Sequence, residues 1–277
     1  MHKESFKLTN IIIVLLLIFG AILFLFPLYL VYVNSFKSLG KILSETLNIP
    51  EKISIANFIY VFKKMKYIRA FLNTTIVTSV SIVLSVIVSS MCAYKFSRSN
   101  DKKSKIIMLG LFSSMIIPFQ TIMIPLVKVA KAFNMVDSIP GLIIVTVALF
   151  SPFAVFLYFS FLKTIPMALD EAARIDGCSE FQAFFLIVFP LLGPVTASVV
   201  VIDALWIWND FALPLVMLQS AENKTVTLVI YSFFGANSMR WDYALAGLTL
   251  SSLPILIFYV FMQKYIISGV VSGSVKG

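Results

Sequence analysis

Six long apolar runs alternate with polar segments along the chain. A helix of about 20 apolar residues, rising about 1.5 Å per residue, crosses the hydrocarbon core of a bilayer. The pattern therefore predicts an all-α integral membrane protein with six transmembrane helices in a single domain, residues 1–277. The predicted spans are residues 11–33, 72–94, 106–127, 140–162, 187–218 and 243–265.

Three of these runs carry features that bear on their packing. Ser81, Ser85 and Ser89 recur every four residues of the second run, and small residues on one face let helices approach closely. A polar lining of a pathway is the alternative. Pro118 and Pro125 in the third run each remove a backbone hydrogen bond and favour a kink. The fifth run is longer than a span needs, so its start is expected at the membrane surface.

Composition supports a membrane protein. The chain is 60% hydrophobic and 13% charged, with a mean hydropathy of +0.97, whereas soluble chains are about 45–50% apolar and about 25% charged. The net charge of +9 then reflects topology and contact with lipid headgroups, and no nucleic acid partner is expected. The first run is too long for a signal peptide and is expected to be a retained span.

Few side chains are suited to catalysis or metal binding. Cys92 and Cys178 are the only cysteines and lie far apart in the sequence, and His2 is the only histidine. These numbers exclude a disulfide framework and most metal sites. No Gly-x-x-x-x-Gly-Lys-Ser/Thr run is present to bind phosphate. No catalytic residue, metal or cofactor is therefore expected in this chain.

A charged stretch separates the fourth and fifth runs, at residues 163–190. Pro166 suits a first helical turn, and Asp170 and Glu171 lie where the helix dipole favours anions. Gly177 is suited to end that helix. The stretch therefore predicts a short surface helix on one membrane face.

A second helix is expected to follow, because Ser179 and Gln182 have the spacing of a capping box. Ala172 and Ala173, flanked by carboxylates, form a low knob that fits a cleft in a partner protein. An ordinary amphipathic loop is the alternative.

The same loop follows a known spacing. Glu171-Ala172-Ala173, Gly177, Ile187 and Pro190 match Glu-Ala-Ala-x3-Gly-x9-Ile-x-Leu-Pro, with Phe189 in place of Leu. The pattern resembles the signature loop of ABC importer permeases. Arg174-Ile175-Asp176-Gly177 is similar to the form typical of the carbohydrate-uptake subfamily.

Three other segments resemble that subfamily. Ile117-Pro118 with Ile124-Pro125-Leu126 is similar to its third span, and Trp208-Asn209-Asp210-Phe211 with Pro214-Leu215 to its fifth. The tail, residues 269–277, resembles the ending of its maltose-permease-G-like members. The resemblance extends from about residue 10 to the end of the chain and is weakest in residues 37–66.

The resemblance implies a permease subunit of an ATP-driven, binding-protein-dependent sugar or oligosaccharide importer in a bacterial-type cell membrane. Expected partners are a homologous second permease, two ATPase subunits that bind Mg-ATP, a solute-binding protein and the lipid bilayer. Residues 163–190 would be cytoplasmic and carry the coupling helix that docks on an ATPase. The implied coupling residues are Glu171, Ala172, Ala173, Arg174, Asp176, Gly177, Ile187 and Pro190.

Topology follows from the same resemblance, which implies that both termini are cytoplasmic. Lys and Arg residues divide evenly between the two sides of the membrane, so their number alone does not decide the orientation. The cluster in residues 95–105 lies in a short loop and favours cytoplasmic termini, whereas basic residues 63–69 oppose them from the longest loop.

Asp203 and Asp210 are the two acidic residues expected within a span. A charge at the bilayer centre costs about 2.5–3.5 kcal/mol on insertion scales, so it usually faces protein or water. The two lie seven residues apart on nearly one helical face, near Trp206 and Asn209. Aromatic rings and carboxylates together suit sugars, which makes these four residues a candidate solute pathway. A structural bond to a neighbouring helix is the alternative.

Two other classes of protein remain as alternatives. An ion-coupled carrier or channel usually needs several buried ionisable groups, and the spans offer two aspartates. A membrane enzyme would need a nucleophile with a base or a metal cluster, and neither is evident.

Overall fold

The computed structural model describes residues 2–64, 66–235 and 238–274. The regular elements among these residues are helices, apart from an antiparallel pair of short strands, β1 (Phe234–Gly235) and β2 (Ser238–Met239). The chain divides into two compact units, unit 1 (residues 1–68 and 229–253) and unit 2 (residues 69–228 and 254–277). Val275–Gly277, the end of the tail that resembles sugar permeases, lies outside the described residues.

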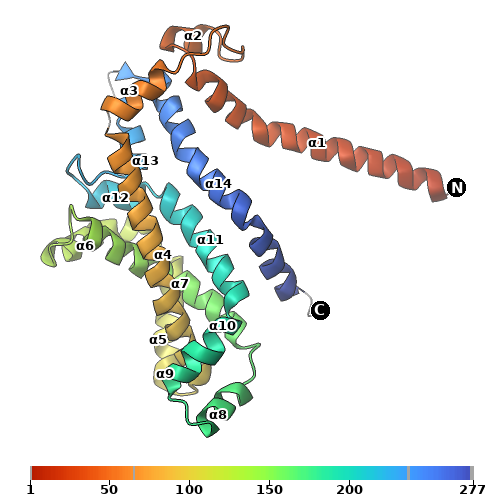
Figure 1. Ribbon diagram of the computed structural model, residues 1–277, viewed down its shortest axis with the longest axis vertical. Helices are drawn as coiled ribbons and strands as arrows, with labels where there is room; N and C mark the ends of the chain where they lie inside the picture. Colours follow the sequence, from red (N-terminus) through yellow and green to blue (C-terminus); the bar gives the residue numbers. More distant parts are fainter. Residues whose placement is uncertain (1, 65, 236–237, 275–277) are drawn as a thin grey trace. The chain divides into compact units, whose positions relative to one another are not determined.

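Figure 1 labels most of the helices along the chain. Their bounds are α1 (His2–Ser35), α2 (Leu39–Ser44), α3 (Ala56–Lys64), α4 (Tyr67–Arg98), α5 (Lys102–Ser113), η1 (Ser114–Ile116), α6 (Phe119–Ala132), α7 (Ile139–Leu162), α8 (Ala168–Ile175), α9 (Glu180–Ala183), η2 (Phe184–Val188), α10 (Phe189–Leu191), α11 (Gly193–Asn209), α12 (Ala212–Met217), α13 (Val226–Tyr231) and α14 (Trp241–Ser274).

Four helices are single spans by length and apolar composition. They are Leu8–Ser35, Tyr67–Arg98, Ile139–Leu162 and Trp241–Gln263, and they confirm four of the predicted runs as membrane-spanning candidates. Two further pairs of helices qualify only when each bent pair is taken together. The described residues thus contain four candidate spans, or six if each bent pair is one span.

Residues 106–127, predicted to form one span kinked at its prolines, are divided between two helices. Lys102–Ile116 and Phe119–Ala132 meet at an angle of 113°. The break falls at Ile117, which has extended backbone angles because the residue before a proline avoids the helical conformation. Pro118 then precedes the first residue of α6, while Pro125 lies inside α6.

The predicted fifth span, residues 187–218, is also interrupted. Glu180–Leu191 and Gly193–Asn209 differ in direction by 77°. Pro194 lies in the first turn of α11, a position where the missing N–H costs little. The helix ends at Asn209, and α12 is a separate short helix. Hydropathy is continuous across these breaks, so it could not reveal them.

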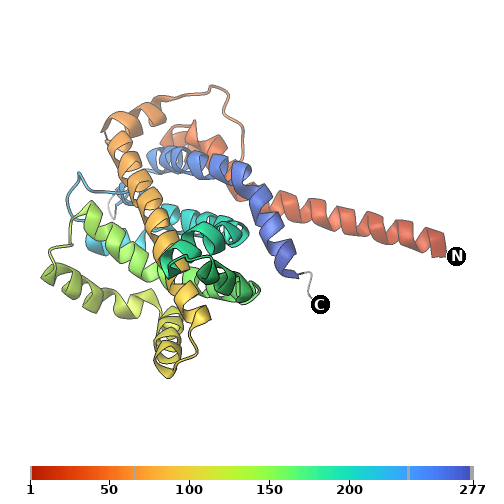
Figure 2. The same ribbon diagram turned by 60° about the horizontal axis from the view of Figure 1, so that its bottom comes forward.

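Unit 1 contains a long helix with little packing against the rest of the unit. The most apolar window of α1 is 0% buried, and Figure 2 shows most of its length standing apart from α2 and α3. Its C-terminal end is tied down by polar contacts: the buried Lys37 side chain donates to Asn34 Oδ1 (2.9 Å) and to the carbonyl of Glu45 (2.7 Å). Burial lowers the pKa of Lys37 below its ordinary value.

Unit 2 holds the larger hydrophobic core. Ser81, Ser85 and Ser89 of α4 are all buried, which confirms that this face packs against other helices. Ser85 donates a hydrogen bond of 2.8 Å to Asp203 of α11, so a polar contact ties the two helices together. Figure 1 shows α8 and α9 at the same end of unit 2 as the C-terminal end of α4.

Candidate functional site

The surface helix predicted after residue 163 is α8. It begins at Ala168, so Pro166 lies before the helix and not in its first turn as predicted. Asp170 and Glu171 occupy the first turn, and Arg174 lies in the last turn. The two acidic residues complement the helix dipole at its start, as predicted, and Arg174 complements it at the other end.

Gly177 ends α8 in the way the sequence predicts. Its φ of +84° is in the left-handed region that glycine adopts without a Cβ clash. The amide of Gly177 donates to the carbonyl of Arg174 (3.1 Å), and that of Cys178 donates to Ala173 (2.9 Å). This pair of bonds is a Schellman motif, which satisfies carbonyls at the end of the helix.

The predicted capping box is also present at the start of α9. The amide of Gln182 donates to Ser179 Oγ (3.3 Å), and the amide of Ser179 donates to Gln182 Oε1 (2.9 Å). The chain continues through η2, a single turn of π-helix that contains Ile187, and α10, which contains Pro190. Capping hydrogen bonds therefore hold the loop both at the end of α8 and at the start of α9.

The outer face of α8 is the surface available to a partner. Glu171, Ala172 and Arg174 are exposed, and the apolar side chain of Ile175 is 86% exposed. Ala173 is buried within the chain, so the expected knob of two alanines is wrong: only Ala172 lies at the surface. Asp176 caps the helix and is exposed.

A buried polar cluster under α8 was missed by sequence reasoning. Asp170 is 5% exposed, and its Oδ2 lies 2.8 Å from Nη2 of Arg98 at the end of α4. Tyr94, one helical turn before Arg98, donates its hydroxyl hydrogen to Asp170 Oδ1. The i, i+4 spacing of Tyr94 and Arg98 was visible in the sequence, but nothing there indicated a partner about seventy residues later.

The four candidate pathway residues do not share one environment. Asp203 is 1% exposed and bonds to Ser85, which matches the structural alternative. Asp210 lies beyond the end of α11, so the expected common helical face with Asp203 was wrong. Trp206 is 45% exposed and packs on Phe153, with ring centroids 5.0 Å apart. Asn209 is exposed, and its amide donates to the carbonyl of Leu205.

Asp210 lines a pocket of about 290 Å³ that lies at the break between Lys102–Ile116 and Phe119–Ala132 and at the end of α11. Oδ1 of Asp210 accepts hydrogen bonds from the backbone amides of Ala212 (3.0 Å) and Leu213 (3.4 Å). These two residues begin α12 and form one wall of the pocket. The lining mixes polar and apolar groups. Its members are Ser114, Met115, Ile117, Phe119, Gln120, Ile122, Leu149, Phe150, Asp210, Ala212 and Leu213.

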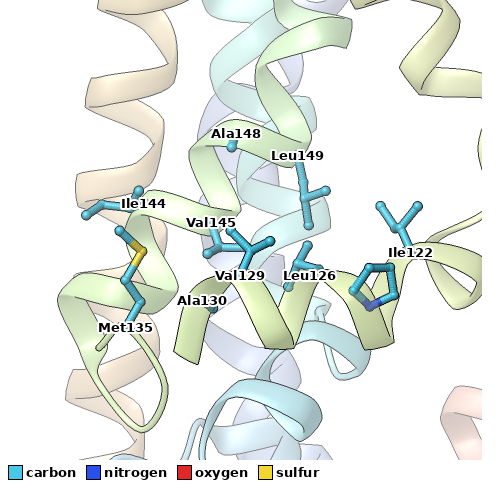
Figure 3. Close-up of a pocket in the computed structure, with 10 residues that line it drawn as sticks. Ile122, Leu126, Val129, Ala130, Met135, Ile144, Val145, Ala148 and Leu149 are labelled. Atoms are coloured by element: carbon cyan, nitrogen blue, oxygen red, sulfur yellow. The ribbon is translucent and has the colours of Figure 1, made fainter. Parts of the chain in front are cut away.

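A larger pocket of about 440 Å³ lies between α6 and α7. Figure 3 shows Leu126 and Val129 of α6 facing Val145 and Leu149 of α7. All of its lining side chains are apolar, so it offers no side-chain group that hydrogen-bonds a hydroxylated solute.

Within the described residues, no group of three or more His, Cys, Asp or Glu side chains could hold a metal ion. Cys92 and Cys178 are free thiols.

These features define a polytopic helical membrane protein with a doubly capped helical loop at one end of unit 2. The chain matches the family described as binding-protein-dependent transport system inner membrane component over residues 85–272. It belongs to that family, whose members are transport permease subunits of the inner membrane.

Curated relatives match nearly the whole chain. It is 38% identical over 275 residues to the "Probable starch degradation products transport system permease protein AmyC" of Thermoanaerobacterium thermosulfurigenes, covering 99% of this chain and 98% of that one. It is 37% identical over 252 residues to the "Melibiose/raffinose/stachyose import permease protein MelC" of Bacillus subtilis, with 91% of each chain covered.

A solved structure has the same fold. It is a bacterial ABC transporter involved in the import of the acidic polysaccharide alginate, with a TM-score of 0.80 over 96% of this chain and 99% of that chain. Sequence identity is 20%.

Proposed function

We propose that this chain is one permease subunit of an ATP-driven importer of a sugar or oligosaccharide. Family membership and the relatives named for sugar import support this function over an ion-coupled carrier. In this proposal each bent helix pair counts as one span, so the chain has six spans and both termini lie on the same side of the membrane. The basic cluster in residues 95–105 and the resemblance to importer permeases favour the cytoplasmic side. A homologous second permease, two Mg-ATP-binding ATPase subunits and a solute-binding protein complete the importer.

The observation that carries the coupling role is the geometry of α8. The Schellman motif and the capping box fix a short helix between two turns, and its outer face exposes Glu171, Ala172 and Ile175. A helix held in this way presents a fixed surface to a groove in another protein. α8 is therefore the coupling helix on the cytoplasmic side, with Ile187 and Pro190 directing the chain back into the membrane.

Glu171→Lys tests the docking role. Reversing the charge on the exposed face is expected to reduce both solute uptake and co-purification of the ATPase subunits at least tenfold. Glu51→Lys is the control, because Glu51 is equally acidic and 82% exposed in unit 1. Normal uptake together with normal co-purification in Glu171→Lys would show that α8 is not the coupling helix.

A solute pathway is proposed at the pocket that contains Asp210. Discontinuous helices often frame the solute site in transporters, because their breaks place polar groups inside the membrane. Gln120 and Asp210 supply hydrogen-bonding groups there, and Phe150 supplies an apolar ring face. Trp206 extends the aromatic wall, with its ring centroid 5.9 Å from that of Phe150. Asn209 adds an exposed amide nearby.

In this proposal Asp203 belongs to the pathway indirectly. Its bond to Ser85 fixes α11 against α4, and α11 leads directly to Asn209 and Asp210. Direct solute contact is assigned to the residues at the pocket.

Asp210→Asn tests the pathway role while preserving an oxygen that can cap α12. Losing a charged acceptor for a solute hydroxyl costs about 1.5–3 kcal/mol, so KM for uptake should rise about tenfold or more. Co-purification of the ATPase subunits should be unchanged. Val129→Ala in the apolar pocket is the control. An unaltered KM in Asp210→Asn would remove Asp210 from the pathway.

Energy coupling is tested separately. Purified importer in vesicles should take up sugar only with ATP and the ATPase subunits. Uptake driven by an ion gradient in their absence would establish the carrier alternative.

A further inference from the structure

Asp170 differs from the other acidic residues of the coupling loop, residues 163–190. Glu171, Asp176 and Glu180 are exposed, whereas the Asp170 carboxylate points into unit 2, and its side chain is 6% exposed. A carboxylate is rarely buried unless it is paired, because desolvation of the charge is costly. The groups that pair with Asp170 therefore determine how α8 is attached to the rest of the unit.

Both partners of Asp170 come from the last two turns of α4. Arg98 forms the ion pair at 2.8 Å, and its own side chain is only 11% exposed. Tyr94 donates its hydroxyl hydrogen to the other carboxylate oxygen. The guanidinium carbon of Arg98 lies 5.8 Å from the centre of the Tyr94 ring, so the two partners also contact each other.

The same two side chains hold the segments on both sides of α8. Nη1 of Arg98 donates to the carbonyl of Ile165, just before the helix (3.3 Å). The ring of Tyr94 packs against Phe184, which follows α9, with ring centroids 5.0 Å apart. The C-terminal end of α4 thus contacts the beginning, the middle and the end of the coupling loop.

α4 also connects this cluster to the core of the unit. Ser85, three turns before the cluster, donates to Asp203 of α11 at 2.8 Å. α11 runs towards Asp210 and the proposed solute pocket. Two buried polar contacts, separated along α4 by a rigid stretch of helix, therefore join α8 and α11 to the same helix. Contiguous packed contacts of this kind can carry coupling between distant sites.

We propose that Arg98, Asp170 and Tyr94 form a rigid link that converts movement of the coupling helix into movement of α4. The link rests on the proposed function, in which an ATPase subunit moves α8. When these three side chains cannot form the link, α8 is expected to shift against α4 as the ATPase closes. ATP hydrolysis then continues while less of its movement reaches the solute pathway.

The exposed ion pair in the same loop provides a contrast. Nη2 of Arg174 lies 3.3 Å from Oε1 of Glu180, and the two side chains are 55% and 69% exposed. Solvent-exposed pairs contribute little, whereas removing one partner of a buried pair leaves an uncompensated charge. The proposal therefore predicts that breaking the buried pair uncouples solute transport from ATP hydrolysis, whereas breaking the exposed pair leaves this coupling unchanged.

The test measures solute transported per ATP hydrolysed by the complete importer in vesicles. Arg98→Gln and Asp170→Asn are each expected to lower this ratio about tenfold, while the ATPase subunits still co-purify and ATP hydrolysis persists. Tyr94→Phe, which removes only the hydroxyl, should lower it about two- to threefold. Glu180→Gln, which breaks the exposed pair, should leave the ratio unchanged.

A charge exchange covers the case in which a single variant fails to assemble. Arg98→Asp combined with Asp170→Arg is expected to recover part of the ratio lost in either single substitution. An unchanged ratio in Arg98→Gln would overturn the proposal. Loss of ATPase co-purification in the single variants would also overturn it unless the charge exchange restores both co-purification and part of the ratio, since the cluster would otherwise only shape α8. The docking role of α8 is tested separately by Glu171→Lys, so failure of the proposed function can be distinguished from failure of the link.

Discussion

Gly177 and Asp137 both adopt left-handed backbone angles, with φ values of +84° and +55°. Gly177 does so without a side chain at the turn after α8. Asp137 does so between α6 and α7, where its side chain makes hydrogen bonds that hold the conformation. The two residues therefore respond differently to substitution.

Gly177→Ala is expected to weaken the coupling loop through the backbone alone. A Cβ at this position would meet no atom within 4 Å, so the cost arises from the left-handed conformation, about 1–2 kcal/mol. Solute uptake should fall severalfold. Gly177→Asn should fall less, because Asn tolerates this region better.

Gly193→Ala is the matched control for this prediction. Gly193 also has open space around its Cβ position, but it is not among the glycines with positive φ. It should retain normal uptake. Equal losses in the two alanine variants would contradict the backbone explanation.

Asp137 ties the loop before α7 to residues 219–223. Its Oδ1 accepts from the amides of Ser220 (2.9 Å) and Gln219 (3.0 Å), and the side-chain amide of Asn223 donates to its carbonyl (2.6 Å). The amides of Ser220 and Gln219 are the main cause that lowers the pKa of Asp137 below its ordinary value. Asp137 therefore stabilises this connection in its charged form.

The stabilisation by Asp137 should disappear in acid. The folded-state pKa is lower than the unfolded value of about 3.9, so the contribution is complete above about pH 4 and is lost as the pH falls through the folded-state pKa. Asp137→Ala should cost about 1.5–3 kcal/mol at neutral pH. The measurement is the thermal unfolding midpoint of the unsubstituted protein and of Asp137→Ala as a function of pH. The two midpoints should converge below pH 4. A constant separation would contradict this.

At the residue scale, the sequence predicted local backbone features well and long-range partners poorly. Gly177, Ser179 and Gln182 occupy the caps expected of them, because such motifs depend on residues within one turn. Asp170 was interpreted as a dipole charge, since nothing in the sequence indicates that Arg98 lies against it. Burial of one carboxylate depends on the tertiary fold.

Among the elements, α7 begins against the preceding loop at very close range. A Cβ on Gly141 would lie 2.1 Å from the carbonyl oxygen of Met135, a backbone atom that cannot rotate away. Ser138 caps the same turn by accepting from the amide of Gly141. Only glycine fits this position without moving the start of α7.

Gly141→Ala is therefore expected to destabilise unit 2 and reduce the amount of folded protein. Overpacking typically costs about 1–3 kcal/mol, and contact with backbone places this substitution at the upper end. Gly110→Ala in α5 meets nothing within 4 Å and should stabilise its helix by about 0.5–1 kcal/mol. Thermal unfolding of both variants checks the prediction. Equal stability of the two variants would contradict the prediction, because it would show that the loop at Met135 moves to accommodate the added methyl group.

The position of each apolar run was predictable, but not every helix break. Long apolar runs identify spans because lipid requires them, and four runs are single helices. Pro118 was expected to kink a span, and it separates two helices instead. The bend near Leu192 and the end of α11 at Asn209 were not predicted, because apolar composition continues across both.

On the scale of the whole molecule, this chain supplies only part of a transport pathway. The proposed solute pocket in unit 2 is lined by residues of η1, α6, α7 and α12, together with Ile117 and Asp210, all within one subunit. The proposed second permease would supply the opposite wall.

The chain alone is therefore expected to give no solute uptake in vesicles, with or without ATP. Adding the second permease, the ATPase subunits and the solute-binding protein should restore it. Uptake by vesicles that contain each permease singly, compared with both together, measures this requirement. Transport by this chain alone would show that it contains a complete pathway.

The isolation of α1 also has a consequence for how the protein is made. Within its span, Leu8–Ser35, the most apolar 18-residue window has a mean hydropathy of 3.2 and is 0% buried by the rest of the chain. Among the described helices it is the first to leave the ribosome. Because its apolar surface makes little contact with the rest of the chain, it can be inserted into the bilayer while the remainder is still being translated. The nascent chain is then anchored in the bilayer before any contact of unit 2 has formed.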